Sequence, residues 1–154
     1  MSGLKGELVA EVEVKSPADE VYDIFKGKMH HLPGKCSKRI QDVKVHHGDW
    51  HLDGSIKNWT YVVAVDGKVE SGKEKVTIDD EKKTVRMVFF EGDPMKDYKV
   101  YNVVIQVIPK GEGGVVKWTL EYERRSESIP PPHRYLDFVT KLTKDLDASL
   151  LSAA

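Results

Sequence analysis

The chain has 154 residues, the length of one ordinary domain, and folding at this length buries roughly 70% of the unfolded surface. Lysine and arginine number 24 against 25 aspartate and glutamate residues, so the formal net charge is -1. This balance gives no field that would attract nucleic acid or an anionic membrane, and no apolar run approaches the ~20 residues that cross a bilayer. We therefore expect one soluble domain over residues 1–154, with no nucleic-acid partner and no membrane insertion.

The N-terminus and the cysteine content indicate the compartment. No apolar segment followed by a small-residue cleavage site occurs at the start of the sequence, so the expected location is cytoplasmic. Cys36 is the one cysteine, which excludes an internal disulfide and a thiolate metal cluster. We interpret Cys36 as a loop or partly buried thiol rather than a nucleophile.

The N-terminal region predicts a strand followed by short helices. Apolar and charged residues alternate over Leu4–Lys15, which is typical of a half-buried strand. Ser16 is the expected N-cap of a helix, Pro17 its first helical residue, and Gly27 its end. Met29–Ser37 is predicted to form a second helical turn and a loop.

Six more strands and a long helix are predicted after this region. The strands are Ile40–His46, Ser55–Val65, Lys68–Asp79, Thr84–Glu91, Tyr98–Pro109 and Val115–Arg124. Short connections, such as the Asp66-Gly67 turn, indicate an antiparallel meander, because parallel strands need crossovers of about a dozen residues. Apolar residues at three- and four-residue steps over Pro132–Leu151 predict an amphipathic helix.

One face of the predicted sheet is aromatic and apolar at every second position. It carries Lys57, Trp59, Tyr61, Val63, Val85, Met87, Phe89, Tyr101, Val103, Ile105, Trp118, Leu120 and Tyr122. A helix ~10 Å across cannot cover seven strands ~4.8 Å apart unless the sheet curls, and curling tends to leave a hollow. These residues alone fit either a solid core or the wall of a ligand pocket.

Three segments resemble the plant major latex protein family. Gly48–Tyr61 is similar to its glycine-rich loop and the strand that follows. Lys28–Pro33 is similar to its Pro-His-His segment, and Glu91–Lys99 to its Glu-Gly-Asp-x-Met-Lys-x-Tyr-Lys segment. The order of predicted elements also matches from Leu4 to Leu151.

The resemblance implies the α+β helix-grip fold of the birch-pollen-allergen group: a seven-stranded curved antiparallel sheet, two short helices and one long C-terminal helix enclosing a cavity. It implies a carrier or buffer of hydrophobic small molecules, such as sterols, fatty acids or phenolics, linked to defence or stress. We expect no catalysis, no cofactor, and a monomer or weak dimer. The expected ligand-binding residues are Phe25, Lys57, Trp59, Tyr61, Met87, Phe89, Tyr101, Val103, Trp118, Leu120, Tyr135, Phe138, Val139 and Leu142.

Two other functions stay open at this point. A few relatives catalyse isomerisation or alkaloid condensation, and here Lys57, Lys99, Glu91 and Tyr101 are the candidate proton shuttles. The alternative to catalysis is that these lysines, together with Lys73 and Lys75, form a solvated rim of the cavity or provide one charge that orients a ligand. A ligand-gated regulator of a protein partner is the other possibility, although no segment marks a docking surface.

Metal and phosphate sites are not predicted. The histidines His30, His31, His46, His47 and His51 lack the spacing of a metal site, since adjacent residues on a strand point to opposite faces. The Gly48–Ser55 loop lacks a Gly-Lys-Ser/Thr motif and precedes a strand rather than a helix, so it does not resemble a phosphate-binding loop.

Overall fold

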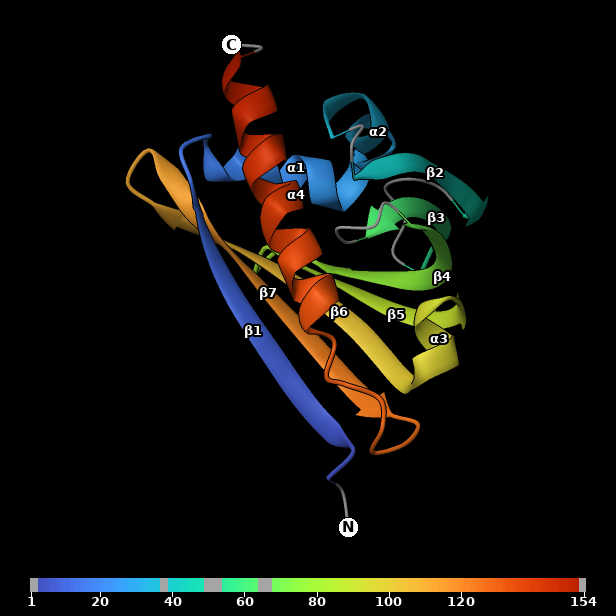
Figure 1. The fold of residues 1–154 in the computed structure, drawn as a ribbon. Helices are drawn as coiled ribbons and strands as arrows, with labels where there is room; N and C mark the ends of the chain where they lie inside the picture. Colours follow the sequence, from blue (N-terminus) through green and yellow to red (C-terminus); the bar gives the residue numbers. More distant parts are fainter. Residues whose placement is uncertain (1–2, 37–38, 49–53, 64–67, 153–154) are drawn as a thin grey trace.

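The computed structural model describes residues 3–36, 39–48, 54–63 and 68–152, with the backbone alone at His46, His47 and Val63. A long helix crosses the concave side of a curved sheet, and short helices lie toward one end of it (Figure 1). The strands are β1 Lys5–Val14, β2 Ile40–His47, β3 Ile56–Val63, β4 Lys68–Asp79, β5 Thr84–Gly92, β6 Tyr98–Lys110 and β7 Gly113–Arg124. The helices are α1 Ala18–Gly27, the 3-10 turn η1 Met29–His31, α2 Leu32–Lys35, α3 Pro94–Asp97 and α4 His133–Ser152.

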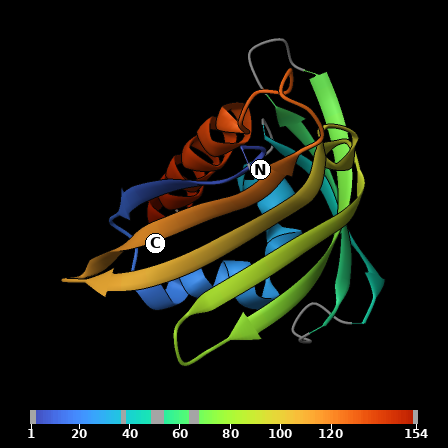
Figure 2. The same cartoon turned by 90° about the horizontal axis from the view of Figure 1, so that it is seen from below.

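The sheet is antiparallel throughout, with the strand order β1-β7-β6-β5-β4-β3-β2. The predicted meander therefore forms from β2 to β7, and β1 adds to its far side by pairing with β7, where Leu8 lies opposite Leu120. Seen from below, the strands curl around a common interior (Figure 2). Register places every second residue on this inner face, so the aromatic stripe of the sequence points inward.

Most predicted boundaries agree with the structure to within two residues. The start of α1 differs by one position, because Pro17 occupies the N-cap and Ser16 does not cap the helix with its side chain. The backbone N–H of Ser16 instead donates to the Asp147 carboxylate at 2.9 Å. The one-turn helix α3 was not predicted, since a single turn is too short to show a helical period.

Parts of two predicted turns lie outside the described residues. These are 49–53 of the glycine-rich loop, which include His51, and 64–67 with the Asp66-Gly67 turn and the end of the predicted strand. The charged turn between β4 and β5 is described and forms a tight connection closed by the hydrogen bond from Lys83 N–H to the Asp80 carbonyl at 3.2 Å.

Helix α4 packs an apolar stripe onto the inner face of the sheet. Tyr135, Val139, Leu142 and Leu146 are all buried. Near its C-terminal end, the Asp147 carboxylate accepts the N–H groups of Lys15 and Ser16, at 3.0 and 2.9 Å. Burial opposes ionisation of Asp147, but these hydrogen bonds outweigh it and lower the pKa of the carboxyl.

In its middle, α4 is tied to β7, because the indole N–H of Trp118 donates to Thr143 Oγ1 at 2.8 Å. None of the described helices combines the length and the apolar character that a membrane crossing requires.

Candidate functional site

An apolar cavity lies between the inner face of the sheet and the helices. It is lined by Phe25, Met29, Leu32, Ile40, Trp59, Tyr61, Met87, Phe89, Tyr101, Val103, Ile105, Trp118, Phe138, Val139 and Leu142. Its volume is about 60 Å³. This space holds a few waters and is well below the roughly 300–1,000 Å³ of most small-molecule sites.

The interior is narrow, because aromatic side chains from the sheet and the helices pack against one another inside it. The rings of Phe25 and Trp118 meet edge to face with centroids 5.4 Å apart. The ring of Tyr101 lies 5.2 Å from that of Phe89, and Tyr61 lies 5.6 Å from Phe138. Ring contacts of this kind stabilise the packed interior by more than the burial of apolar surface alone. A ligand therefore has to displace them in order to bind.

Eleven of the fourteen predicted binding residues line this cavity: Phe25, Trp59, Tyr61, Met87, Phe89, Tyr101, Val103, Trp118, Phe138, Val139 and Leu142. Lys57, Leu120 and Tyr135 are buried but are not part of the lining. Leu120 packs in the core between the register partners Leu8 and Val103, while Lys57 and Tyr135 turn their polar ends to other partners.

Four lining residues were absent from the predicted set. Ile105 lies on the inward face that the alternation predicted, so its signal was present in the sequence. Ile40 is the first residue of β2, and Met29 and Leu32 belong to η1 and α2. A short turn has no periodicity that shows which of its side chains point inward, so no sequence signal marked these two.

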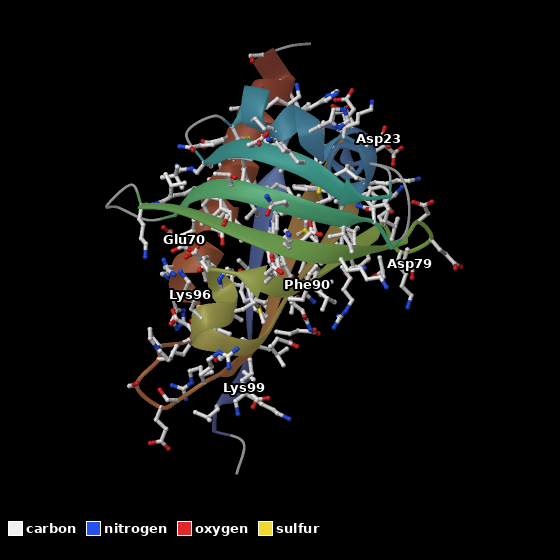
Figure 3. The ribbon with its side chains drawn as sticks, turned by 90° about the vertical axis from the view of Figure 1, so that its right-hand side faces the viewer. Asp23, Glu70, Asp79, Phe90, Lys96 and Lys99 are labelled. Carbon is white, nitrogen blue, oxygen red and sulfur yellow. The ribbon has the colours of Figure 1, made fainter. Side chains whose placement is uncertain are left out.

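One buried polar group is the Glu70 cluster, which consists of Glu70, Tyr61, Arg134 and Tyr135. Arg134 Nη1 donates to Glu70 Oε2 at 2.8 Å, and the Tyr135 hydroxyl donates to Oε1 at 2.6 Å. The Tyr61 hydroxyl, on the cavity wall, lies 3.5 Å from the same Oε1. The cluster ties the first turn of α4 to β4, and Glu70 lies beside the N-terminal end of that helix (Figure 3).

The tyrosines of the Glu70 cluster remain protonated donors at ordinary pH. Burial, and then the negative charge of Glu70, raises the pKa of Tyr61 far above its usual value. Burial is also the main reason that the pKa of Tyr135 is raised, with Tyr61 and Glu70 acting in the same direction.

A second buried polar group is the Glu74 cluster, which consists of Glu74, Trp59, Lys57 and Ser55. The indole N–H of Trp59 donates to Glu74 Oε1 at 2.5 Å. Lys57 is the register partner of Glu74 on β3, and its Nζ donates to Ser55 Oγ at 2.8 Å. Burial raises the pKa of Glu74 to about 8, against the opposing effects of the Trp59 hydrogen bond and the Lys57 charge.

Neither carboxylate was among the predicted site residues, although the sequence held a signal. Val76 is fully buried on β4, and stepping back from it by two residues reaches Glu74, Gly72 and Glu70. The alternation therefore placed both carboxylates on the inner face. They were not selected as site residues because acidic side chains are rarely fully buried in proteins.

The lysines that the sequence placed at the cavity mouth divide between the two faces. Lys57 turns inward, but Lys73 lies on the outer face and pairs with Glu91 at 3.1 Å. Lys75 is exposed, and Lys99 Nζ lies 3.9 Å from a Glu123 oxygen. Lys99 and Glu91 were candidate proton shuttles, and their exposure separates them from Tyr101 inside the cavity.

The remaining reactive side chains do not form a recognisable site. Among the described residues, no group of three or more His, Cys, Asp or Glu side chains could hold a metal ion. The side chains of His46, His47 and His51 lie outside the described set. Cys36 is buried more deeply than predicted, and burial, followed by the charge of Asp145, raises its pKa to about 12. Its thiolate form is therefore scarce at neutral pH.

A curved seven-stranded antiparallel sheet that grips a long C-terminal helix around an apolar cavity defines the helix-grip class of folds. The model of the pathogenesis-related protein Bet v 1 family matches residues 3–153, and the chain belongs to this family.

Individual relatives place the chain near the major latex proteins. Major latex protein 146 of Papaver somniferum is 38% identical, over 99% of this chain and 96% of that protein. MLP-like protein 28 of Arabidopsis thaliana is 39% identical over 98% of this chain, which spans about half of that relative, 45% of its length. The crystal structure of ginseng major latex-like protein 151 from Panax ginseng superposes with a TM-score of 0.90 at 33% identity, covering 95% of this chain and 97% of that one.

Proposed function

We propose that the protein binds hydrophobic small molecules in the cavity between the sheet and α4 and acts as their carrier or buffer. The observation that carries this proposal is the lining, which consists of aromatic and aliphatic side chains drawn from strands and helices far apart in the sequence. Membership of the Bet v 1 family supports a ligand-binding role in general. The apolar wall matches sterols, fatty acids or phenolics, which bury most of their surface on binding.

Binding requires the cavity to widen, because the free volume of about 60 Å³ is smaller than any of these ligands. Met29 of η1 and Met87 of β5 both line the cavity, are unbranched and can change rotamer at low cost. Slender ligands such as fatty acyl chains need the least rearrangement. We expect them to bind with higher affinity than rigid ligands of the same apolar area.

We further propose carriage rather than conversion of the ligand. Two of the four residues that a cavity catalyst would use, Lys99 and Glu91, are exposed, and their nearest ionic partners are Glu123 and Lys73 on the surface. Incubation with plant keto and amine compounds should therefore give no accelerated conversion. Turnover that is lost in a Lys57→Met variant would overturn this part of the proposal.

The resemblance to major latex proteins supports four finer proposals. We propose that residues 1–154 act as one ligand-binding domain, as a monomer or weak dimer. We propose a cytoplasmic location and a role in defence or stress responses. Pull-downs with and without ligand test the competing function of a ligand-gated regulator, since a carrier recruits no ligand-dependent protein partner.

Tryptophan fluorescence tests the carrier function directly, because Trp59 and Trp118 line the cavity. We expect quenching that saturates at micromolar concentrations of at least one ligand class. The matched variants are Val103→Phe, which fills the cavity, and Val104→Phe, which adds the same group to the outer face of the same strand. Val103→Phe should weaken binding about tenfold or more and Val104→Phe should not. No spectral change with any ligand class, or equal loss in both variants, would count against the proposal.

A further inference from the structure

Glu74 is an unusual buried acid, because one of its carboxyl oxygens has no hydrogen-bond donor among the described residues. The residue is fully buried, and Oε1 accepts the indole N–H of Trp59. Within the described part of the chain, Oε2 has no hydrogen-bond partner. About nine in ten buried polar atoms in proteins have one, so an acceptor without a donor calls for an explanation.

The neighbouring acid on the same strand shows that the inner face can satisfy a buried carboxylate. Glu70 accepts hydrogen bonds on both oxygens, from Arg134 on Oε2 and from Tyr135 on Oε1. Strand geometry therefore does not force an unpaired oxygen on Glu74. The missing donor to Oε2 is therefore a property of the side chains around Glu74.

Trp59 places this unpaired oxygen next to the ligand cavity. Its indole is part of the cavity wall, and its N–H holds the other oxygen of Glu74. The Trp59 side chain therefore links the cavity to the carboxyl group of Glu74. A ligand that displaces the indole brings its polar end within reach of Glu74, at the point where the otherwise apolar wall becomes polar.

The charges beside Glu74 define which polar end it can accept. Lys57 lies across from it on β3 and already places one positive charge in this buried layer. Above the Glu74 pKa of about 8, where the carboxylate is ionised, a ligand carboxylate would add a second negative charge next to Glu74, and a ligand ammonium would add a second positive charge next to Lys57. A neutral hydroxyl adds neither, and it donates the hydrogen bond that Oε2 lacks.

We propose that Glu74 is a specificity-determining residue of the cavity and that it selects apolar ligands ending in a hydroxyl over the same ligands ending in an ether or a carboxylate. This inference rests on the proposed carrier function and names the ligand class of the same site. The ether serves as the critical comparison, because it keeps the size and the oxygen but cannot donate a hydrogen bond.

The test uses calorimetric titration of the full chain with 1-decanol, decyl methyl ether and decanoate at pH 9, above the Glu74 pKa of about 8, where the carboxylate is ionised and both of its oxygens can only accept hydrogen bonds. Loss of one hydrogen bond to a buried charged group weakens binding about tenfold, so we expect decanol to bind about ten times more tightly than the ether. Decanoate should bind more weakly than decanol for the charge reason given above. Equal affinity for decanol and the ether would overturn the inference.

A pair of variants tests whether the preference for decanol over the ether depends on Glu74. In Glu74→Gln the amide oxygen can accept the Trp59 N–H, which leaves an N–H₂ group where Oε2 was, so the tenfold preference for decanol should fall to about one. Glu70→Gln is the matched control on the same strand and should retain the preference. A preference that survives in Glu74→Gln would refute the role of Glu74 while leaving the carrier function intact. Failure of all three ligands to bind the wild type would refute the carrier function and the inference with it.

Discussion

The two buried carboxylates of β4 project from the same face of the same strand, yet they differ in how completely their neighbours satisfy them. Glu70 meets the Arg134 guanidinium and the Tyr135 hydroxyl at 2.8 and 2.6 Å. Glu74 has the Trp59 indole on one oxygen and no hydrogen-bond donor from the described residues on the other. The difference arises because the first turn of α4 reaches Glu70 and provides its donors. Glu70 therefore links helix α4 to the sheet, whereas Glu74 keeps one oxygen without a donor from the described residues, beside the Trp59 indole that forms part of the cavity wall.

The largest expected effect on the free energy of unfolding comes from removing the Glu70 link between α4 and β4. Glu70→Ala removes the acceptor of three side chains, Tyr61, Arg134 and Tyr135. Breaking one partner of a buried ion pair costs about 3–5 kcal/mol, and Arg134 is partly exposed and can recover water, so we expect a loss of about 3 kcal/mol. Urea denaturation measures this free energy of unfolding. A cost no greater than that of Glu74→Ala would remove the distinction between the two sites.

The second effect is a pH dependence that Glu74 imposes. Its pKa of about 8 in the folded protein lies above the ordinary value of 4.5, so between these limits the folded state holds a proton that the unfolded chain has released. The stability from this group is complete below about pH 4.5 and is lost as the pH rises through 8.

The variant Glu74→Gln cannot ionise and keeps the shape of the side chain. Its free energy of unfolding should therefore rise relative to that of the wild type between pH 5 and pH 8. From pH 5 to pH 6.5 a relative gain of about 2 kcal/mol is expected, because between the two pKa values of 4.5 and about 8 each pH unit changes the difference by about 1.4 kcal/mol. Denaturation curves recorded across this range provide the measurement. Parallel pH profiles of the two proteins would contradict the prediction.

The smallest effect separates the two tyrosines of the Glu70 cluster. Tyr135→Phe removes a hydrogen bond of 2.6 Å to a buried carboxylate and should cost about 1.5 kcal/mol. Tyr61→Phe removes a contact of 3.5 Å, at the limit of hydrogen bonding, and should cost less than about 0.5 kcal/mol. Thermal unfolding of the two variants under one buffer condition compares them. A larger loss of stability in Tyr61→Phe than in Tyr135→Phe would mean that the Tyr61 hydroxyl makes the stronger hydrogen bond to Glu70.

The fold was largely predictable because its signals are local. Alternation over β1 and over β3 to β7 marks strands, short turns make them antiparallel, and the three- and four-residue spacing marks α4. The same alternation placed Trp59, Tyr101 and Trp118 inside, where the structure also has them. Met29 and Leu32 were not identified as wall residues, since η1 and α2 are too short for a period to show their inner side.

The sequence by itself determined the architecture, because alternation, turn residues and helical spacing act between residues close together along the chain. It also determined that the interior would be aromatic and apolar. Only the tertiary structure decided how far the inward rings fill that interior, leaving about 60 Å³. It also decided that Arg134 and Tyr135 reach Glu70, while one oxygen of Glu74 finds no donor in the part of the chain that the structure describes. Those outcomes depend on how α4 lies across the sheet, and no local pattern encodes a contact between residues more than sixty positions apart.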